Sequence, residues 1–277
     1  MRISCAIVSY NNGTLLEEAI MSVLDQTRPV DEIIVADDAS TDGSRQLIEG
    51  LSHKFPKIRP ILRDRNLGVT TNRDLALRQA SGDLITFLDG DDRFLPTKIA
   101  AESKVIGTHE QAIAFSDVRI VDRARQRFLT RAIGDFSALG PQERVRWLLV
   151  RTRQSPAAML MPKHVHLRIG GHNRRLQTYE DWDYILRLAA EPLQWVHSGA
   201  EGLVHHPGGG LSNQRATRHM LEQLRVLRVN RELARHHVGL PTLAAVTGKV
   251  IVSGVKWTII PWLWETRRRL RDRRRRN

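Results

Sequence analysis

The feature that most limits the fold of this chain is the alternation of apolar runs with helix-like segments between Arg2 and Asp92. Apolar runs with the length and composition of strands occupy residues 3–9, 32–36, 58–63 and 84–88. Apolar strands that alternate with helices are typical of a parallel sheet covered on both faces. The pattern therefore predicts an α/β nucleotide-type fold, a mostly parallel Rossmann-like sheet flanked by helices, for the first third of the chain.

The segments between these runs carry helix signals. Thr14 and Glu17 have the spacing of a capping box, so we expect the first helix to begin with Thr14 as its cap. A second helix is expected after Asp42 and Gly43, and a third over residues 71–80. Each helix then connects one strand to the next.

The rest of the chain gives weaker signals. We expect strands at 112–115 and 157–161, and helices that open at Pro96 or cover 143–150, 180–190 and 212–236. No internal repeat is visible. The simplest division is a catalytic domain over residues 1–210, made of a nucleotide-binding part (1–92) and an acceptor-side part (93–210), followed by a helical extension over 211–277.

Three acids follow the strand at 84–88 directly: Asp89, Asp91 and Asp92. Ligands of open α/β sheets bind beyond the carboxyl ends of strands, which is where these acids project. Crowded carboxylates repel one another, and a hard cation such as Mg²⁺ or Mn²⁺ relieves that repulsion by taking their oxygens as ligands. The alternative is a solvated acidic turn, but the position at a strand end favours metal binding.

A second acidic pair, Asp37 and Asp38, ends the apolar strand at 32–36. Asp38 can accept hydrogen bonds from a nucleobase imide or a ribose hydroxyl. Asp42, before Gly43, is explained by a turn or a helix start alone. Two neighbouring strands thus present acids at one edge of the predicted sheet.

Six motifs occur in an order and at intervals that resemble the family 2 glycosyltransferases with the GT-A fold. They are VSYNN (8–12), DDASTDGS (37–44), NLG (66–68) with Arg73, SGD (81–83), FLDGDD (87–92) and YEDWD (179–183). The resemblance covers about residues 2–210, is strong up to Asp92, thin over 93–155 and moderate again from Pro156.

The resemblance implies a domain that binds a nucleotide-sugar donor. The positions matching those that hold the nucleotide are Val8, Tyr10, Asp38 and Arg73. By the same resemblance, Asp89 and Asp91 form the DXD motif, with Asp91 the nearer to the metal ion, Mg²⁺ or Mn²⁺, and to the donor diphosphate. His206, and less so His205, matches a place where the family often has a residue that reaches the metal or the diphosphate; a structural role for both histidines remains open.

The resemblance makes Asp181 of the ED pair the general base. An acceptor alcohol attacks an anomeric carbon only as its proton leaves, and a positioned carboxylate takes that proton. Glu180 and Asp181 cannot both face the same way on a helix, and the favourable place of an acid at a helix N-terminus explains one of them. Metal-assisted departure of the nucleoside diphosphate with attack from the opposite face inverts the sugar carbon.

The sequence departs from the family pattern in two places, one that bears on nucleotide binding and one that bears on the type of sugar transfer. Asn72-Arg73-Asp74 stands where the family usually has Ala-Arg-Asn, and Ala76 stands where Gly is common, which weakens the nucleotide contact assigned to Arg73. No Gln-x-x-Arg-Trp motif follows the ED pair. Processive synthases of the family usually carry that motif, so an enzyme that adds a single sugar is expected.

The C-terminal region suggests contact with an anionic membrane. Of the formal net charge of +13, residues 265–277 contribute +6, through eight arginines and two acids. Residues 246–264 are apolar and hold Trp257, Trp262 and Trp264, but also two lysines and a proline, which makes a poor membrane span. Tryptophans beside arginines suit the headgroup interface. A core helix and a solvated basic tail are the competing interpretations.

The sequence indicates a cytoplasmic protein, and the C-terminal region extends that expectation to peripheral contact with the cytoplasmic face of the membrane. Cys5 is the only cysteine, so no intramolecular disulfide forms, and the apolar run at the N-terminus is too short for a signal peptide. No known nucleic-acid module is visible, so nucleic-acid binding is not expected. A UDP- or dTDP-sugar donor and a carbohydrate or glycolipid acceptor are the expected partners.

Three rival functions remain at this point. A scaffold of the same fold without turnover is disfavoured by the intact Asp89, Asp91 and Asp181. A nucleotidyltransferase is disfavoured because no glycine-rich phosphate loop with a following lysine lies near the first strand. A dinucleotide-dependent dehydrogenase is disfavoured because no G-x-G-x-x-G follows residues 3–9.

Overall fold

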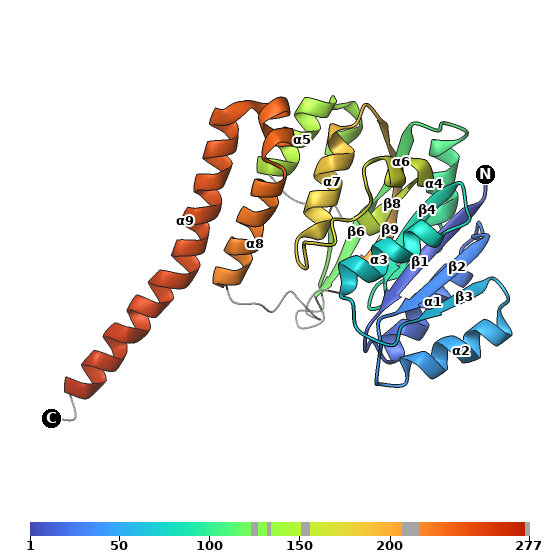
Figure 1. Ribbon diagram of the computed structural model, residues 1–277, viewed down its shortest axis with the longest axis horizontal. Helices are drawn as coiled ribbons and strands as arrows, with labels where there is room; N and C mark the ends of the chain where they lie inside the picture. Colours follow the sequence, from blue (N-terminus) through green and yellow to red (C-terminus); the bar gives the residue numbers. More distant parts are fainter. Residues whose placement is uncertain (123–126, 132–133, 151–155, 207–215, 275–277) are drawn as a thin grey trace. The chain divides into compact units, whose positions relative to one another are not determined.

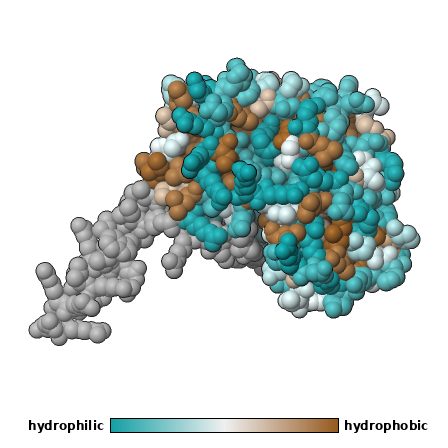
Figure 2. Space-filling model, viewed as in Figure 1, coloured by the Kyte–Doolittle hydropathy of each residue, from teal (hydrophilic) through white to brown (hydrophobic). Residues whose placement is uncertain are grey.

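A computed structural model of the 277-residue chain describes residues 1–122, 127–131, 134–150, 156–206 and 216–274. The chain divides into two compact units, Met1–Gly209 and Gly210–Asn277. The first unit contains the sheet and the second is helical. Hydrophilic residues cover most of the visible coloured surface, with apolar side chains in scattered patches (Figure 2).

The first unit is built from strands and helices in the following order (Figure 1). The strands are β1 (Ile3–Ser9), β2 (Glu32–Asp37), β3 (Ile58–Leu62), β4 (Leu84–Asp89), β5 (Arg93–Phe94), β6 (Ala112–Asp122), β7 (Arg127–Arg131), β8 (Met159–Pro162) and β9 (Gln194–His205). The α-helices are α1 (Thr14–Leu24), α2 (Ser44–Lys54), α3 (Val69–Gln79), α4 (Lys98–Ile106), α5 (Pro141–Val150), α6 (Lys163–Arg168) and α7 (Glu180–Ala190). Two 3₁₀ turns, Gly134–Ala138 and Pro156–Ala158, complete the described part.

The strands form one mixed sheet in the order β3-β2-β1-β4-β8-β6-β9-β5, with β7 on β6. β1 pairs in parallel with both β2 and β4, and every residue of β1 is buried. The α/β prediction is confirmed. The sheet becomes antiparallel at β8, which pairs with β4, so the second half of the unit extends the parallel part rather than repeating it.

The start of α1 differs from the prediction. The residue before the helix is Gly13, with a backbone φ of 53°, and no side chain caps the helix. The Gly13 N–H instead donates to Asp42 Oδ2 at 2.8 Å, from the loop before α2. Thr14 is therefore the first helical residue and the predicted capping box is wrong, because an acid from the next βα loop takes the role at long range.

The second unit contains α8 (Ala216–Val229) and α9 (Arg231–Arg274). The single helix predicted over 212–236 is interrupted at Asn230, and its first residues, 212–215, lie outside the described residues. α9 is broken at Gly239, whose φ of 78° is not helical, and Pro241 suits the first turn of the helix that follows. The side chains of Trp257, Trp262 and Trp264 also lie outside the described part. Within the described residues, every helix is too short or too polar to cross a membrane.

Candidate active site

The carboxyl ends of three adjacent parallel strands bring the predicted acids together. In the register of β1, Ser9 pairs with Asp37 of β2 and Val8 pairs with Asp89 of β4. Asp37 accepts hydrogen bonds from the backbone N–H and the hydroxyl of Ser40, which fixes the turn after β2. The strand ends therefore form one acidic edge, as the sequence predicts.

The turn after β4 lies directly against β1. The Gly90 N–H donates to the carbonyl of Val8 at 2.9 Å. A Cβ at position 90 would lie 2.9 Å from Asn12 Oδ1 and 3.0 Å from the Val8 carbonyl oxygen, so a larger residue would force Asn12 or the turn to move. Val8 is only 4% exposed, so it is the backbone of this residue, and not its side chain, that lies at the edge of the sheet. The close approach places Asp89 and Asp91 on either side of a fixed glycine.

Asp91 lies among like charges. Burial raises the pKa of its carboxyl to about 6, and the neighbouring charges of Asp92 and Asp89 add to the shift. Ionising such a carboxyl costs free energy, and a bound cation would offset that cost by stabilising the carboxylate. The electrostatics of this turn thus fit a metal ion.

Asp92, which the sequence placed only among the three crowded acids after β4, contacts both histidines. It accepts from His205 Nδ1 at 3.0 Å and from the backbone N–H of His206 at 2.9 Å. The His205–Asp92 hydrogen bond raises the pKa of His205. His206 Nδ1 lies 2.9 Å from the carbonyl oxygen of Asp91, which can only accept, so Nδ1 carries the proton. In this tautomer of the neutral ring, Nε2 carries the lone pair that a metal ion needs.

The candidate metal-binding side chains suit a metal ion that is also coordinated by a bound nucleotide. Among the described residues, no group of three or more His, Cys, Asp or Glu side chains is already gathered around a common point. Mg²⁺ does not require such a cage, because it usually binds through one or two carboxylates and takes water and phosphate oxygens for the remainder. Asp91, Asp89 and His206 Nε2 fit that kind of site.

A buried arginine joins the two acidic motifs. Arg73 on α3 is 3% exposed, and its Nη1 donates to Glu180 Oε1 at 2.8 Å while its Nη2 donates to Asp89 Oδ1. The guanidinium also lies 4.6 Å from the centre of the Phe87 ring. Burial raises the pKa of Glu180 to about 7, and the Arg73 charge opposes that rise. This link was not predicted from the sequence, although an arginine on a helix that packs against a sheet is a signal for a buried acidic partner.

Asp181 lies in the first turn of α7, next to Glu180. Its Oδ1 accepts from the Trp182 N–H at 2.7 Å. The helix follows Tyr179, whose φ of 60° is uncommon for a residue other than glycine. The two other positive φ angles at described non-glycine residues are at Asn11 after β1 and Ala39 after β2. Strain of this kind is concentrated in functional sites, and here it marks the loops that carry the motifs.

The nucleotide-side residues lie at the same edge with different surroundings. Asp38 is 2% exposed, and its two oxygens accept from the N–H groups of Leu67 and Gly68, both at 2.8 Å. Each oxygen keeps a second acceptor site. Tyr10, after β1, is 51% exposed. Asp38 therefore joins the NLG loop to β2, and Tyr10 offers an open ring beside it.

The whole arrangement is a GT-A-type fold. The crystal structure of S. aureus TarS 1–349 superposes on the chain with a TM-score of 0.69, covering 93% of this chain and 73% of TarS 1–349, at 16% sequence identity. TarS 1–349 has also been crystallised with UDP and with UDP-GlcNAc. At this identity the likeness concerns the fold alone.

Sequence comparison gives the family. The profile of Glycosyl transferase family 2 matches residues 4–162. The uncharacterized glycosyltransferase YwdF of Bacillus subtilis is 30% identical over 193 residues, 69% of each chain. TuaG of the same organism, provisionally assigned to teichuronic acid biosynthesis, is 34% identical over 114 residues, which span 41% of this chain and only 44% of TuaG. The chain belongs to glycosyl transferase family 2.

Proposed function

We propose that the protein is a metal-dependent, inverting glycosyltransferase that moves a sugar from a nucleoside-diphosphate sugar to an acceptor hydroxyl. The observation that carries the proposal is the Arg73 bridge, in which one guanidinium contacts Asp89 of the DXD motif and Glu180 of the ED pair. The bridge ties the acids after β4 to the start of α7, which supports a role for Asp181 beside the bound diphosphate.

The donor side has assigned roles in this proposal. Asp38, Tyr10 and the backbone of Val8 hold the base and the ribose, and UDP or dTDP is the favoured nucleotide. Asp91, Asp89 and His206 would hold Mg²⁺ or Mn²⁺, which when bound neutralises the charge that grows on the leaving diphosphate. Arg73 acts through Asp89, because its guanidinium is buried and already donates to two carboxylates.

Asp181 supplies the chemistry on the acceptor side. Its carboxylate accepts the proton of the attacking hydroxyl as the bond to the anomeric carbon forms and the bond to the diphosphate breaks. Attack and departure take place on opposite faces of the sugar, so one displacement inverts the anomeric centre. The N–H of Trp182 donates to one oxygen of this carboxylate, which helps to hold the base in position.

The acceptor we propose is a carbohydrate or a glycolipid, such as a lipid-linked or surface polysaccharide intermediate. The name of TuaG supports this class, as does the charge of the C-terminal region, where eight arginines lie within residues 265–277. A basic segment of this kind holds a protein reversibly on the anionic cytoplasmic face of a membrane. A lipid-linked acceptor would then be within reach.

The test is release of nucleoside diphosphate from a panel of UDP-, dTDP- and GDP-sugars, with Mg²⁺ or Mn²⁺ and with EDTA. We expect metal-dependent release from one donor, and its loss in Asp181→Asn. Asp25→Asn is the matched control, since Asp25 is exposed at the end of α1 and away from the strand ends that carry the acids. If no donor releases nucleoside diphosphate and none protects the protein against unfolding, a scaffold without turnover would be supported instead.

A further inference from the structure

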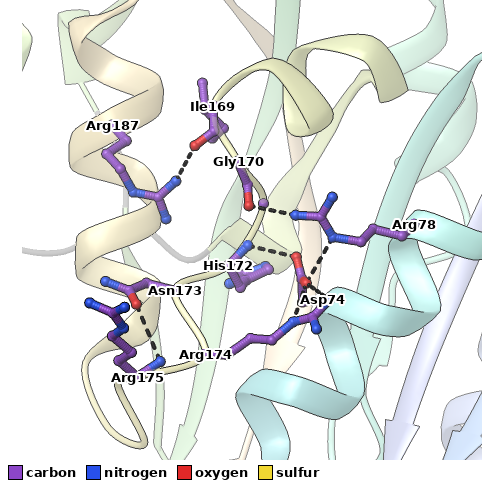
Figure 3. A pocket seen from close by; sticks show the side chains of 10 residues that line it. Asp74, Arg78, Ile169, Gly170, His172, Asn173, Arg174, Arg175 and Arg187 are labelled. Atoms are coloured by element: carbon purple, nitrogen blue, oxygen red, sulfur yellow. Dashed lines mark hydrogen bonds and ion pairs between the residues drawn. The ribbon is translucent and has the colours of Figure 1, made fainter.

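A second charged site lies on α3 and α7, away from the acidic edge. It is a pocket of about 400 Å³ lined by the C-terminal parts of both helices and by the loop 169–175. Figure 3 shows Arg78 and Arg174 converging on Asp74, while Arg187 reaches toward Ile169 from α7. The residues that contribute charge are Asp74, Arg78, Arg174, Arg175 and Arg187.

The positive charge of this pocket exceeds its negative charge. Arg78 and Arg174 share one carboxylate, that of the fully buried Asp74, through contacts of 2.9 and 2.6 Å. Arg187 is paired with the buried Asp183, whereas the described residues offer no partner to the Arg175 guanidinium, which is exposed. Burial holds the pKa of His172 well below its ordinary value, so its ring adds no charge. The guanidiniums therefore set the sign of the pocket.

The arginines are held in place yet keep unused donors. Arg78 Nε donates to Asp74 and its Nη2 to the Gly170 carbonyl at 2.6 Å, which leaves its Nη1 without a partner in the described chain. Arg174 likewise donates from Nε and Nη2 to Asp74, and its Nη1 has no partner in the described chain. A guanidinium has five N–H donors in a fixed plane, and one that is already ordered loses little entropy when an anion binds.

The loop is shaped for this arrangement. Gly171 has a φ of 74°, and a Cβ there would lie 2.1 Å from Asp74 Oδ1. The backbone N–H of His172 donates to the same oxygen at 2.9 Å. The carboxylate that orders the arginines can thus enter the loop only because position 171 is glycine.

The pocket is connected to the acceptor side of the site. The loop 169–175 continues directly into the start of α7, which carries Asp181. The Thr70 hydroxyl donates to the Leu176 carbonyl at 2.7 Å and so fixes this connection to the first turn of α3. Asp181 and Arg187 lie six positions apart on α7, a rise of about 9 Å along a helix. An acceptor with its hydroxyl at Asp181 can therefore extend an anionic group to the arginines.

We propose that this pocket binds a phosphodiester group of the acceptor, as found in lipid headgroups and polyol-phosphate chains. Arg175 and the remaining donors of Arg78 and Arg174 bind its oxyanions. The inference rests on the proposed function and adds to it the chemical class of the acceptor. It explains why two arginines share one carboxylate, beside a third arginine with no acidic partner among the described residues, at a place that takes no part in the proposed donor binding.

The test is an NMR titration of the ¹⁵N-labelled full chain with glycerophosphoglycerol, a soluble phosphodiester, at constant ionic strength in EDTA. Without a divalent cation the acids after β4 repel anions, so shifts of amides beside the pocket report on the pocket and not on the donor site. We expect saturable shifts of the Gly170, Gly171 and His172 amides. Arg175→Gln should weaken binding about tenfold, the effect of losing a charged hydrogen bond. Arg28→Gln removes an equal charge in the loop between α1 and β2 and should change nothing.

Each other outcome overturns the inference. Absence of a saturable shift means that there is no site, and equal weakening by Arg28→Gln means a general charge effect. A parallel titration with inorganic phosphate identifies the source: binding of phosphate without the diester would make free phosphate the ligand. No donor or turnover enters the titration, so diester binding without sugar transfer would refute only the proposed function, and transfer without diester binding would refute only this inference.

Discussion

The Arg73 bridge makes a quantitative prediction about stability. Arg73→Met keeps much of the side-chain volume but leaves Glu180, whose side chain is only 10% exposed, without its cation. Removing one partner of a buried ion pair costs about 3–5 kcal/mol. Asp89, with a side chain that is 36% exposed, adds little because water reaches it. We therefore expect Arg73→Met to lower the free energy of unfolding by about 3–5 kcal/mol.

Glu180→Gln should cost much less. Its amide oxygen still accepts from Arg73, and Arg73 keeps Asp89, so we expect a loss of about 1–2 kcal/mol. The double variant leaves no charge unpaired in the interior. Its destabilisation should therefore fall about 2–3 kcal/mol short of the sum of the two single changes.

Urea unfolding followed by circular dichroism measures this cycle, with Arg28→Gln as a charge-matched variant outside the bridge. Sugar transfer should also fall in Arg73→Met at temperatures where the protein is folded, because the two acidic motifs are no longer joined. Additive single and double changes, within about 0.5 kcal/mol, would refute the bridge as a coupled element.

Three further predictions concern other parts of the molecule. Gly171→Ala should destabilise the fold by about 2–4 kcal/mol in urea unfolding, because the added Cβ would meet Asp74. Gly170→Ala should cost only about 1 kcal/mol, because Gly170 has a φ of 86° but open space around it. Equal costs for the two variants would contradict the loop geometry. In EDTA, the free energy of unfolding should fall by about 1–2 kcal/mol as the pH rises from 4 to 6. The reason is that Asp91, whose pKa is about 6 in the folded protein against 3.8 ordinarily, keeps a proton that the unfolded chain has lost. If thermal unfolding of Asp91→Asn shows the same dependence of stability on pH, this carboxyl is not the cause. Deleting residues 265–277 should abolish sedimentation with phosphatidylglycerol vesicles and leave donor cleavage intact, and retained binding would remove the basic tail from the account.

The first 92 residues were predictable because their signals are local. The strands over β1 to β4 follow from apolar runs, and the acids after β2 and β4 follow from the rule that parallel strands end at one edge. The order of the elements after Arg93 was not predictable, because β8 enters the sheet beside β4 through pairs such as Ile85 with Met161, which are far apart in sequence.

The interior of the site was hidden for the same reason. Arg73 and Glu180 are separated by 107 positions, and neither residue shows by itself that the other is its partner. Asp92 was predicted only as one of three crowded acids, yet it holds His205 and the backbone of His206. Sequence patterns identified the acids at one edge of the sheet, whereas the charges that hold those acids in place required coordinates.

The central claim is a single displacement with Asp181 as the base, and the anomeric configuration of the released sugar tests it most directly. Water can replace the acceptor, so ¹H NMR of the anomeric proton during metal-dependent cleavage of the donor reports the first product before mutarotation. The account predicts a β-sugar from an α-linked donor, and no cleavage by Asp181→Asn. A first product with the configuration of the donor, or full activity of Asp181→Asn, would contradict it.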